Sequence, residues 1–200
     1  MNILHRFLRP AMLAGLLALA ACAPYSLIPA EPTSVANFQV DVGSPWNKVN
    51  RLRIDSSAPV AYWTSDGPAL DSILFIGGVK SGQPIVTINR SDDDKDKLLF
   101  RDTMTSAEIV ELWEATVAKV FNTTLAEGKN VQPARFAGVD GFRFDFTYVP
   151  KDEVDRKGTG YGAVKDGRLY LIFFSGTKLY HFGLREAEAM HIMQTAKITG

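Results

Sequence analysis

Few residues of this chain have the types and the spacing that catalysis requires. Ser175-Gly176-Thr177-Lys178 matches the S-x-x-K motif, whose serine is the nucleophile of penicillin-interacting enzymes. The S-D-N and K-T-G elements that work beside this motif do not occur in the chain. We therefore interpret the four residues as a hairpin turn, and the sequence predicts no catalytic residue.

The sequence gives equally little evidence for a metal site. Beyond residue 21 the chain has two histidines, His181 and His191, and neither belongs to an H-E-x-x-H motif. Asp92, Asp94 and Asp96 imitate the start of a calcium loop, which needs glycine at its sixth and glutamate at its twelfth position. A lysine and a threonine stand there instead. The sequence thus predicts a solvated acidic cluster, with no metal and no cofactor.

A glycine-rich segment, Gly158-Thr159-Gly160-Tyr161-Gly162, has the composition of a phosphate cradle. Such a cradle follows a strand and opens a helix, whereas this segment leads into a predicted hairpin. Glycine inside a strand is typical of positions that another group approaches closely. We therefore expect a strand whose glycines make room for neighbouring atoms.

The one cysteine, Cys22, offers a different chemistry, because a thiol can be acylated. It follows an apolar run over residues 11–20, and this run is preceded by Arg6 and Arg9. The arrangement is typical of a secretory signal peptide. A membrane-spanning helix needs about 20 apolar residues, so the run is too short to stay as an anchor. The sequence therefore predicts a signal peptide over residues 1–21.

The order Leu19-Ala20-Ala21-Cys22 resembles the lipobox of bacterial lipoproteins. The resemblance implies cleavage between Ala21 and Cys22, a diacylglycerol on the Cys22 sulfur, and an acyl chain such as palmitate on the new amino group. Each buried CH₂ contributes about 0.8 kcal/mol, so two or three chains hold a protein firmly on a membrane. In Gram-negative lipoproteins an aspartate at the next position favours the inner membrane, and here that position is Ala23. The resemblance thus implies the inner leaflet of the outer membrane, facing the periplasm.

Composition excludes several classes of protein. Residues 1–21 hold two of the 22 basic residues, so 20 remain beside 22 acidic residues and the net charge becomes −2. Nucleic-acid binding normally requires a basic stripe, so no nucleic-acid partner is expected. The hydrophobic content of 46% is that of a folded domain. Once Cys22 is acylated, no thiol is left for a disulfide or a thiolate metal site.

Two segments follow the signal peptide. Residues 22–36 contain three prolines and little periodicity, so we expect a flexible, extended tether. Residues 37–200 are long enough for a single domain with its own core. The first half of this domain predicts short strands at residues 38–42, 49–54, 60–64, 72–79 and 84–88.

The second half has clearer signals. Thr105-Ser106-Ala107-Glu108 fits a capping box, and apolar residues then recur at helical spacing through Phe121. Aromatic residues alternate with polar ones over 142–148, which indicates a strand with one buried face. Lys165-Asp166-Gly167 predicts a hairpin turn. Further strands are expected at 160–164, 168–174 and 178–182, and a last helix at 186–198.

This order of elements predicts an α+β fold, an antiparallel sheet with a long middle helix and a C-terminal helix packed on it. Between about residues 100 and 195 it resembles the Mog1/PsbP-like fold, in the Gly160-Tyr161-Gly162 strand, the hairpin after it and the strand over 169–174. Members of that fold class are mostly binding or assembly factors, so the resemblance implies a non-catalytic protein. The segment from Trp63 to Asp71 also resembles a stretch found in uncharacterised proteobacterial lipoproteins.

Several aromatic and charged residues could line a groove for a ligand or partner if they point away from the core. The candidates are Trp63, Asp66, Arg143, Asp145, Tyr161 and Tyr180. The competing interpretation is that the aromatic residues belong to the core and that Arg143 and Asp145 form a cross-strand ion pair.

We therefore expect a membrane-anchored, non-catalytic envelope protein that binds another envelope protein or, next in order, a small or lipidic ligand. One alternative is a structural lipoprotein without a specific ligand. The other is an envelope hydrolase whose active site is assembled from residues far apart in the sequence. That site would bring together some of Asp66, Glu108, Lys165 and His181.

Overall fold

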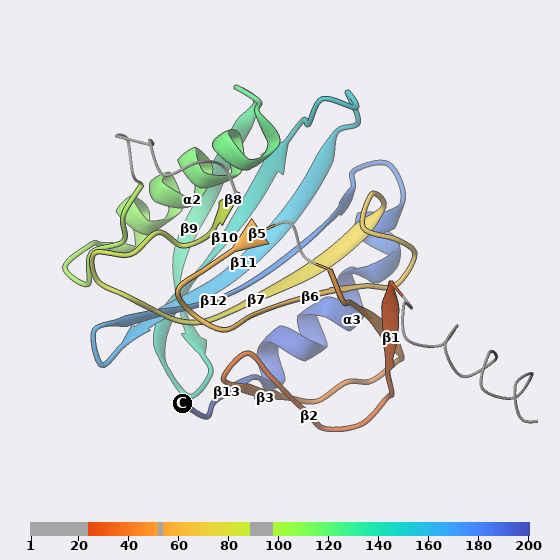
Figure 1. Cartoon of the computed structure of the whole chain (residues 1–200), viewed down its shortest axis with the longest axis horizontal. Coiled ribbons are helices and arrows are strands. Elements are labelled where there is room, and N and C mark those ends of the chain that lie inside the picture. The colour runs from red at the N-terminus through yellow and green to blue at the C-terminus, as the bar shows by residue number, and fades with distance from the viewer. Residues whose placement is uncertain (1–23, 52–53, 89–97) are drawn as a thin grey trace, which may run out of the picture.

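An eight-stranded antiparallel sheet forms the centre of the computed structural model, which describes residues 24–51, 54–88 and 98–200 (Figure 1). From one edge to the other, its strands are β1 (Tyr25–Ile28), β4 (Trp46–Val49), β6 (Val60–Thr64), β7 (Asp71–Lys80), β12 (Arg168–Thr177), β11 (Arg156–Lys165), β10 (Val139–Tyr148) and β9 (Ala126–Phe136). The predicted signal peptide, Cys22 and the acidic cluster at 91–97 lie outside the described residues.

The described residues contain two helices, which cover opposite faces of this sheet (Figure 1). α2 (Ser106–Phe121) packs on β9 and β10, and α3 (His181–Thr195) packs on β12 and β11. Two small sheets complete the fold: β13 (Lys197–Ile198) with β3 (Phe38–Val40) and β2 (Thr33–Val35), and β5 (Ile54–Asp55) with β8 (Thr87–Ile88). The predicted α+β class is confirmed. Within the described ranges, neither helix is long and apolar enough to cross a bilayer.

Two hydrophobic cores lie on the two sides of the main sheet. Successive side chains of a strand point to opposite faces, so Ile73 and Phe75 of β7 pack on the α3 side while Leu74 and Ile76 pack on the α2 side. Because both faces are covered, β7 and β12 are buried along almost their whole length. These two strands therefore connect the cores.

The start of α2 has the predicted capping box. The Glu108 N–H donates to the Thr105 hydroxyl at 3.3 Å, and the Thr105 N–H donates to the Glu108 carboxylate at 2.7 Å. These bonds satisfy two backbone donors that a helix start leaves free. The bond from the Thr105 N–H is the main cause that lowers the pKa of the Glu108 carboxyl, and a bond from the Thr105 hydroxyl adds to it. At the other end Asn122 adopts the left-handed conformation and stops the helix.

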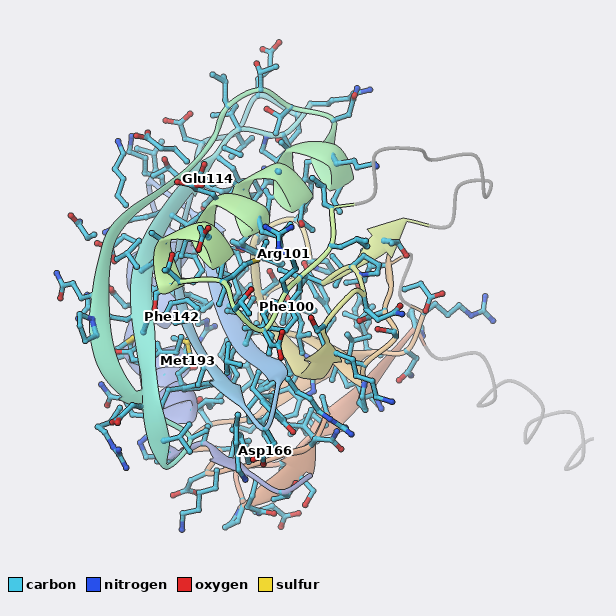
Figure 2. All side chains as sticks on the ribbon, turned by 90° about the vertical axis from the view of Figure 1, so that its left-hand side faces the viewer. Phe100, Arg101, Glu114, Phe142, Asp166 and Met193 are labelled. Carbon is cyan, nitrogen blue, oxygen red and sulfur yellow. The ribbon has the colours of Figure 1, made fainter. Side chains whose placement is uncertain are left out.

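Strand β10 has the alternation that the sequence predicts, with Phe142, Phe144 and Phe146 in the core on the α2 side. Figure 2 labels the first of them, Phe142. Their rings lie over the neighbouring strand β11, whose glycines leave space for them. A Cβ atom on Gly160 would stand 2.3 Å from ring carbons of Phe144. The glycine-rich segment is thus a strand that other groups approach closely, as expected.

Strand β9 is not predicted by the sequence pattern, because most of its residues are exposed and apolar residues do not alternate in it. Two contacts with the rest of the fold hold it in place. It pairs with β10 over its whole length, and its Gly128 N–H donates to the Glu114 carboxylate of α2 at 2.6 Å (Figure 2). Partners distant in sequence, rather than local preference, therefore form this strand.

The chain after β12 differs from the prediction. Ser175, Gly176 and Thr177 are the last residues of β12 and not a turn, and α3 begins at His181, where a strand over 178–182 was expected. The reason lies in the α3 core, where the Phe182 ring stacks on Phe174 with 5.3 Å between ring centroids. Strand-like alternation of residues 178–182 is overruled by this contact.

The expected tether is also corrected from residue 25 onwards. Tyr25 to Ile28 form β1, the edge strand of the main sheet, with Tyr25 opposite Val49 and Ile28 opposite Trp46. Residues 33–35 form β2. Most of β1 is exposed, so its sequence has no buried face that would indicate a strand. Backbone pairing with β4 is what orders it.

The turn between β2 and β3 packs directly on the main sheet at Gly77. Ala36 and Asn37 both have positive φ, as in a tight hairpin turn, and the Asn37 amide donates to the Gly77 carbonyl at 2.9 Å. A Cβ atom on Gly77 would stand 1.7 Å from the Ala36 carbonyl oxygen. Only glycine lets this turn reach the sheet.

We expect Gly77→Ala to lower the free energy of unfolding by about 2–3 kcal/mol, because the turn must move away from the sheet. Urea unfolding followed by circular dichroism measures this change. Gly183→Ala is the matched control, since no atom lies within 4 Å of its added Cβ and alanine favours a helix by up to about 1 kcal/mol. Equal stability of the two variants would contradict the contact.

Candidate functional site

An apolar cavity of about 380 Å³ lies on the α2 side of the sheet. Most of its wall consists of hydrophobic side chains from α2, from three strands of the main sheet and from the segments at residues 54 and 86. These are Val49, Ile54, Leu74, Val86, Trp113, Val117, Val120, Phe121 and Phe173. Small-molecule sites are typically cavities of about 300–1,000 Å³ with such walls. The volume and the lining therefore suit a small apolar molecule.

Five residues with hydroxyl groups also line this cavity: Tyr62, Ser72, Thr116, Tyr148 and Ser175. The Ser175 hydroxyl lies 3.2 Å from that of Ser72 and 3.1 Å from that of Tyr148. The Thr116 hydroxyl donates to the Leu112 carbonyl at 2.7 Å. Burial raises the pKa of the Tyr148 phenol, and burial likewise raises that of Tyr62. The hydroxyls of Ser72, Ser175 and Tyr148 thus serve one another as neutral hydrogen-bonding partners.

The described lining of the cavity carries little charge. Among the described residues that line it, Arg51 is the only charged one, and these residues include no histidine, carboxylate or lysine. A serine nucleophile needs a neighbouring base to activate it. Ser175, the serine of the S-x-x-K match, has hydroxyl partners instead, and Lys178 pairs with Asp155 at 3.3 Å.

A second hollow, of about 560 Å³, lies beside the start of β9 and the end of β10. Its wall is more polar, and its cations are already paired. Lys129 lies 2.7 Å from Glu127, and Arg156 lies 2.6 Å from Asp152. The ion pair with Arg156 lowers the pKa of Asp152 to about 2. Such compensated charges leave little attraction for a charged ligand.

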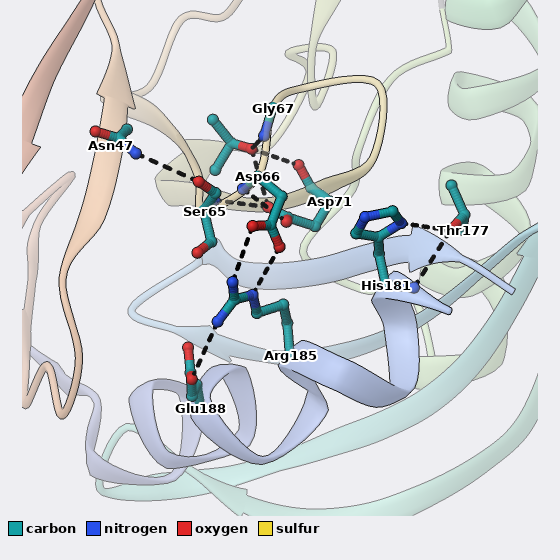
Figure 3. A network of polar contacts seen from close by, with 10 residues as sticks. Asn47, Ser65, Asp66, Gly67, Asp71, Thr177, His181, Arg185 and Glu188 are labelled. Atoms are coloured by element: carbon teal, nitrogen blue, oxygen red, sulfur yellow. Dashed lines mark hydrogen bonds and ion pairs between the residues drawn. The ribbon is translucent and has the colours of Figure 1, made fainter. Parts of the chain in front are cut away.

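A polar network closes the turn between β6 and β7 (Figure 3). The Asp71 carboxylate accepts the Thr64 hydroxyl at 2.9 Å and the N–H groups of Ser65 and Asp66 at 2.7 and 2.9 Å. Burial raises the pKa of Asp71, and these hydrogen bonds oppose that shift. The turn is therefore fixed by its own residues.

Arg185 of α3 ties this turn to the helix (Figure 3). Its guanidinium donates to both oxygens of Asp66 at 2.8 and 2.9 Å, and it lies 3.3 Å from Glu188. The hydrogen bonds from Arg185 are the main cause that lowers the pKa of Asp66. Asp66 is thus held as an ionised, fully paired carboxylate, which is unsuited to accept a proton near neutral pH.

The four residues of the hydrolase hypothesis do not form one site. His181 lies near Asp66 at the start of α3, but its Nδ1 is 2.9 Å from the Thr177 hydroxyl (Figure 3). Glu108 caps α2 on the opposite face of the sheet, and Lys165 ends β11 at the hairpin with β12. Among the described residues, no group of three or more His, Cys, Asp or Glu is arranged to hold a metal ion.

The six residues predicted for a groove are dispersed. Trp63 is 1% exposed and packs on Phe75 in the α3 core, with 4.6 Å between ring centroids. Tyr180 is 63% exposed at the start of α3. Trp63 and Asp145 are separated by four strand spacings, about 19 Å in all.

Three of the six do lie together. Arg143 and Asp145 of β10 form an ion pair of 3.8 Å, and Tyr161 of β11 stands opposite Arg143. Tyr161 belongs to the α3 core. The core position of Tyr161 agrees with the competing interpretation, whereas the ion pair joins two residues of β10 and does not cross between strands.

The residues of the cavity were missed for a physical reason. Tyr62 lines the cavity while its neighbour Trp63 lies in the other core, so the face of β6 decides which aromatic residue can meet a ligand. The serines at 72 and 175 meet only because β7 pairs with β12. The sequence signal that could have separated the two aromatic residues is the alternation of side chains along β6, which places Tyr62 and Trp63 on opposite faces of the sheet.

The ion pair between Asp66 and Arg185 predicts a pH-dependent contribution to stability. The folded pKa of Asp66 lies below its unfolded value of 3.8, so the contribution is present above that pH and is lost as pH falls through the folded value. We expect Asp66→Asn to lower the free energy of unfolding at pH 7 by up to about 1 kcal/mol, since the pair is partly exposed. Urea unfolding at pH 7 and at pH 2.5 measures both values.

At pH 2.5 the difference in stability between the Asp66→Asn variant and the unmodified protein should be smaller than at pH 7. The control is Asp140→Asn, which removes an ion pair of 2.6 Å with Arg135 whose two side chains are largely exposed. This variant should be close to the unmodified protein at both pH values. A deficit of Asp66→Asn that is the same at both pH values would refute the electrostatic explanation.

Comparisons with known proteins concern the fold. No protein-family model matches the chain, and no curated protein matches it in sequence. The structure is similar to the solution structure of cyanobacterial PsbP (CyanoP) from Synechocystis sp. PCC 6803, with a TM-score of 0.52 and 10% identity over 89% of this chain and 94% of that chain. LpqN, involved in cell envelope biogenesis of Mycobacterium tuberculosis, aligns over 90% of this chain and 88% of its own at 9% identity, but its TM-score of 0.32 is too low to support an argument. The chain has a PsbP-like α+β fold.

Proposed function

We propose that this protein is a membrane-anchored, non-catalytic binding module of the cell envelope, and that the apolar cavity under α2 is its binding site. The cavity is the observation that carries the proposal. It combines a volume of about 380 Å³ with a largely hydrophobic wall and a row of mutually bonded hydroxyls. Such a site gains affinity by removing apolar surface from water.

The anchor is proposed from the sequence. Cys22 follows a signal peptide and an order of residues that resembles a lipobox. Ala23 after it favours the outer membrane, with the domain facing the periplasm. The first described strand of the domain begins at Tyr25, so the domain can bind a ligand while the lipid on Cys22 keeps the domain at the membrane.

A small ligand comes first in this proposal and a partner protein second, the reverse of the order expected from the sequence. The reason is that the cavity has room for a small molecule, whereas the six candidate groove residues do not gather into one surface. The envelope hydrolase gains no support, because Asp66 is paired with Arg185 and the lining residues that the structure describes include no base. The structural lipoprotein without a ligand is the alternative that a binding experiment tests.

We expect the cavity to bind N-phenyl-1-naphthylamine, an uncharged apolar dye that becomes fluorescent in apolar surroundings. The Cys22→Ala chain, purified without detergent, is titrated with the dye. Val120→Trp places a large side chain into the cavity from the partly buried end of α2, and the affinity should fall about tenfold or more, which corresponds to about 1.4 kcal/mol.

Val131→Trp is the matched control, because Val131 lies exposed on β9, away from the cavity. This variant should bind the dye with the same affinity as the Cys22→Ala chain without a second substitution. Circular dichroism of both variants verifies folding. Equal affinity of the Val120→Trp and Val131→Trp variants, or no binding by the Cys22→Ala chain alone, would refute the proposal that the cavity is the binding site.

The anchor is tested by fractionation of cells. We expect the unmodified protein in the outer-membrane fraction and the Cys22→Ala variant in the soluble periplasmic fraction, because the variant lacks the acceptor of the lipid. Mass spectrometry of the unmodified protein should find Cys22 as the first residue, carrying fatty acids. Persistence of Cys22→Ala in the membrane, or an unacylated Cys22, would refute the lipid anchor.

A further inference from the structure

We propose that the ligand of this cavity is an anionic amphiphile drawn from the membrane itself, with its acyl chain inside the cavity and its head group at Arg51. This inference rests on the proposed function, because it identifies the class of ligand for the same site. It is carried by three observations: the position of the first described strand, the charge at the cavity mouth, and the state of the hydroxyls inside.

The chain enters the fold beside the cavity. Tyr25 is opposite Val49, and since Lys48 is opposite Trp63, Val49 lies next to Tyr62. Val49 and Tyr62 both line the cavity, so Tyr25 extends the same row and faces the same side of the sheet. Burial is the main cause that raises the pKa of Tyr62, and the nearby Tyr25 phenol adds to it.

The proposed anchor is close to this row. Three Cα–Cα steps separate Cys22 from Tyr25, so the two Cα atoms lie at most about 11 Å apart. A lipid on Cys22 would therefore hold the cavity side of β1 at the membrane surface. Entry of a ligand from the bilayer would then need only a short path.

The edge strand has side chains suited to that surface. Tyr25 is 41% exposed and Leu27 is 68% exposed, and residues two apart on a strand share a face. Both thus lie on the cavity side of the sheet. Tyrosine is enriched where membranes meet water, because its ring is apolar and its hydroxyl is polar. An apolar rim therefore connects the expected membrane surface with the cavity.

Arg51 supplies the charge that selects an anionic head group. It is exposed and lines the cavity, which places its guanidinium at the mouth. Among residues 24–51, 54–88 and 98–200 it has no carboxylate partner. A guanidinium binds carboxylate and phosphate with two parallel hydrogen bonds.

The interior suits an aliphatic chain. Ser72, Ser175 and Tyr148 hydrogen-bond with one another, so they require no polar group of the ligand. The remaining wall is hydrophobic. The acyl chains of the anchor itself are the other nearby source, but a chain that enters the cavity leaves the bilayer, and the anchor then loses about 0.8 kcal/mol for each of its CH₂ groups. A chain of a membrane amphiphile leaves the anchor intact, and we therefore infer this source.

The test uses the full lipidated protein in phosphatidylcholine vesicles that contain palmitic acid with a photoreactive diazirine near the end of its chain. After irradiation, mass spectrometry should find label on residues of the cavity wall, such as Leu74, Val117 and Phe173. Arg51→Gln should reduce this label about two- to fivefold, the range for an exposed ion pair. Arg135→Gln, which removes an exposed arginine far from the cavity, should leave it unchanged.

An uncharged probe, palmityl alcohol with the same diazirine, separates the head group from the chain. It should label the same residues, and Arg51→Gln should not change its yield. Label that is confined to Tyr25 and Leu27, while the dye still binds the cavity, would overturn this inference and leave the proposed function standing.

Failure of both the dye and the photoreactive lipids to reach the cavity would overturn both proposals. Label in the cavity of Cys22→Ala alone, and not of the lipidated protein, would show that the chain of the anchor occupies the cavity, and would overturn the membrane source. An effect of Arg51→Gln that is equal for the acid and the alcohol would overturn the role of the charge.

Discussion

The pairing of β7 with β12 is the constraint on which the rest of the structure depends. Each strand is buried on both faces and contributes alternate residues to the α3 core and to the α2 core. Burial of apolar surface contributes about 25 cal/mol per Å², so a strand that serves two cores stabilises both at once. The same pairing brings Ser72 opposite Ser175 and thereby creates the polar row inside the cavity.

The cavity follows from the uneven cover of the α2 face. α2 packs over β9 and β10, where the phenylalanine rings of β10 fill the space beneath it. The β4 and β6 edge of that face lies beyond the reach of these rings, and smaller side chains such as Val49 and Val86 meet there. Close packing on one flank of the helix and incomplete packing on the other leave an apolar hollow between them.

Much of the fold follows from local chemistry. The capping box at Thr105 and the alternation over 142–148 predict α2 and β10, and the turn at Lys165-Asp166-Gly167 has the positive φ values of a tight hairpin at Asp166 and Gly167. Edge strands could not be predicted in this way. β1 and β9 are largely exposed, so neither carries a hydrophobic pattern, and both form because a neighbouring strand offers unpaired backbone groups.

The candidate site was less predictable than the fold. Residue type indicated Trp63 and Tyr161, but the face of a strand decides whether an aromatic side chain meets a core or a cavity. Arg185 could not be linked to Asp66, because 119 residues separate them and a guanidinium on a helix has many possible partners. Only Asp66 and His181 of the proposed catalytic residues come near each other, and both have other partners.

The ordered strand β1 changes what a lipid on Cys22 would do. A flexible tether over residues 22–36 would have an end-to-end distance of about 20 Å and would let the domain turn freely. With β1 paired to β4 from Tyr25 onwards, the link between Cys22 and the sheet is at most about 11 Å, and a lipid on Cys22 would hold one edge of the sheet at the membrane. The domain would then be oriented as well as retained. Val49 belongs to β4, the strand next to this edge, and it also lines the cavity. The edge that a lipid would hold at the membrane and the cavity therefore lie on the same side of the molecule.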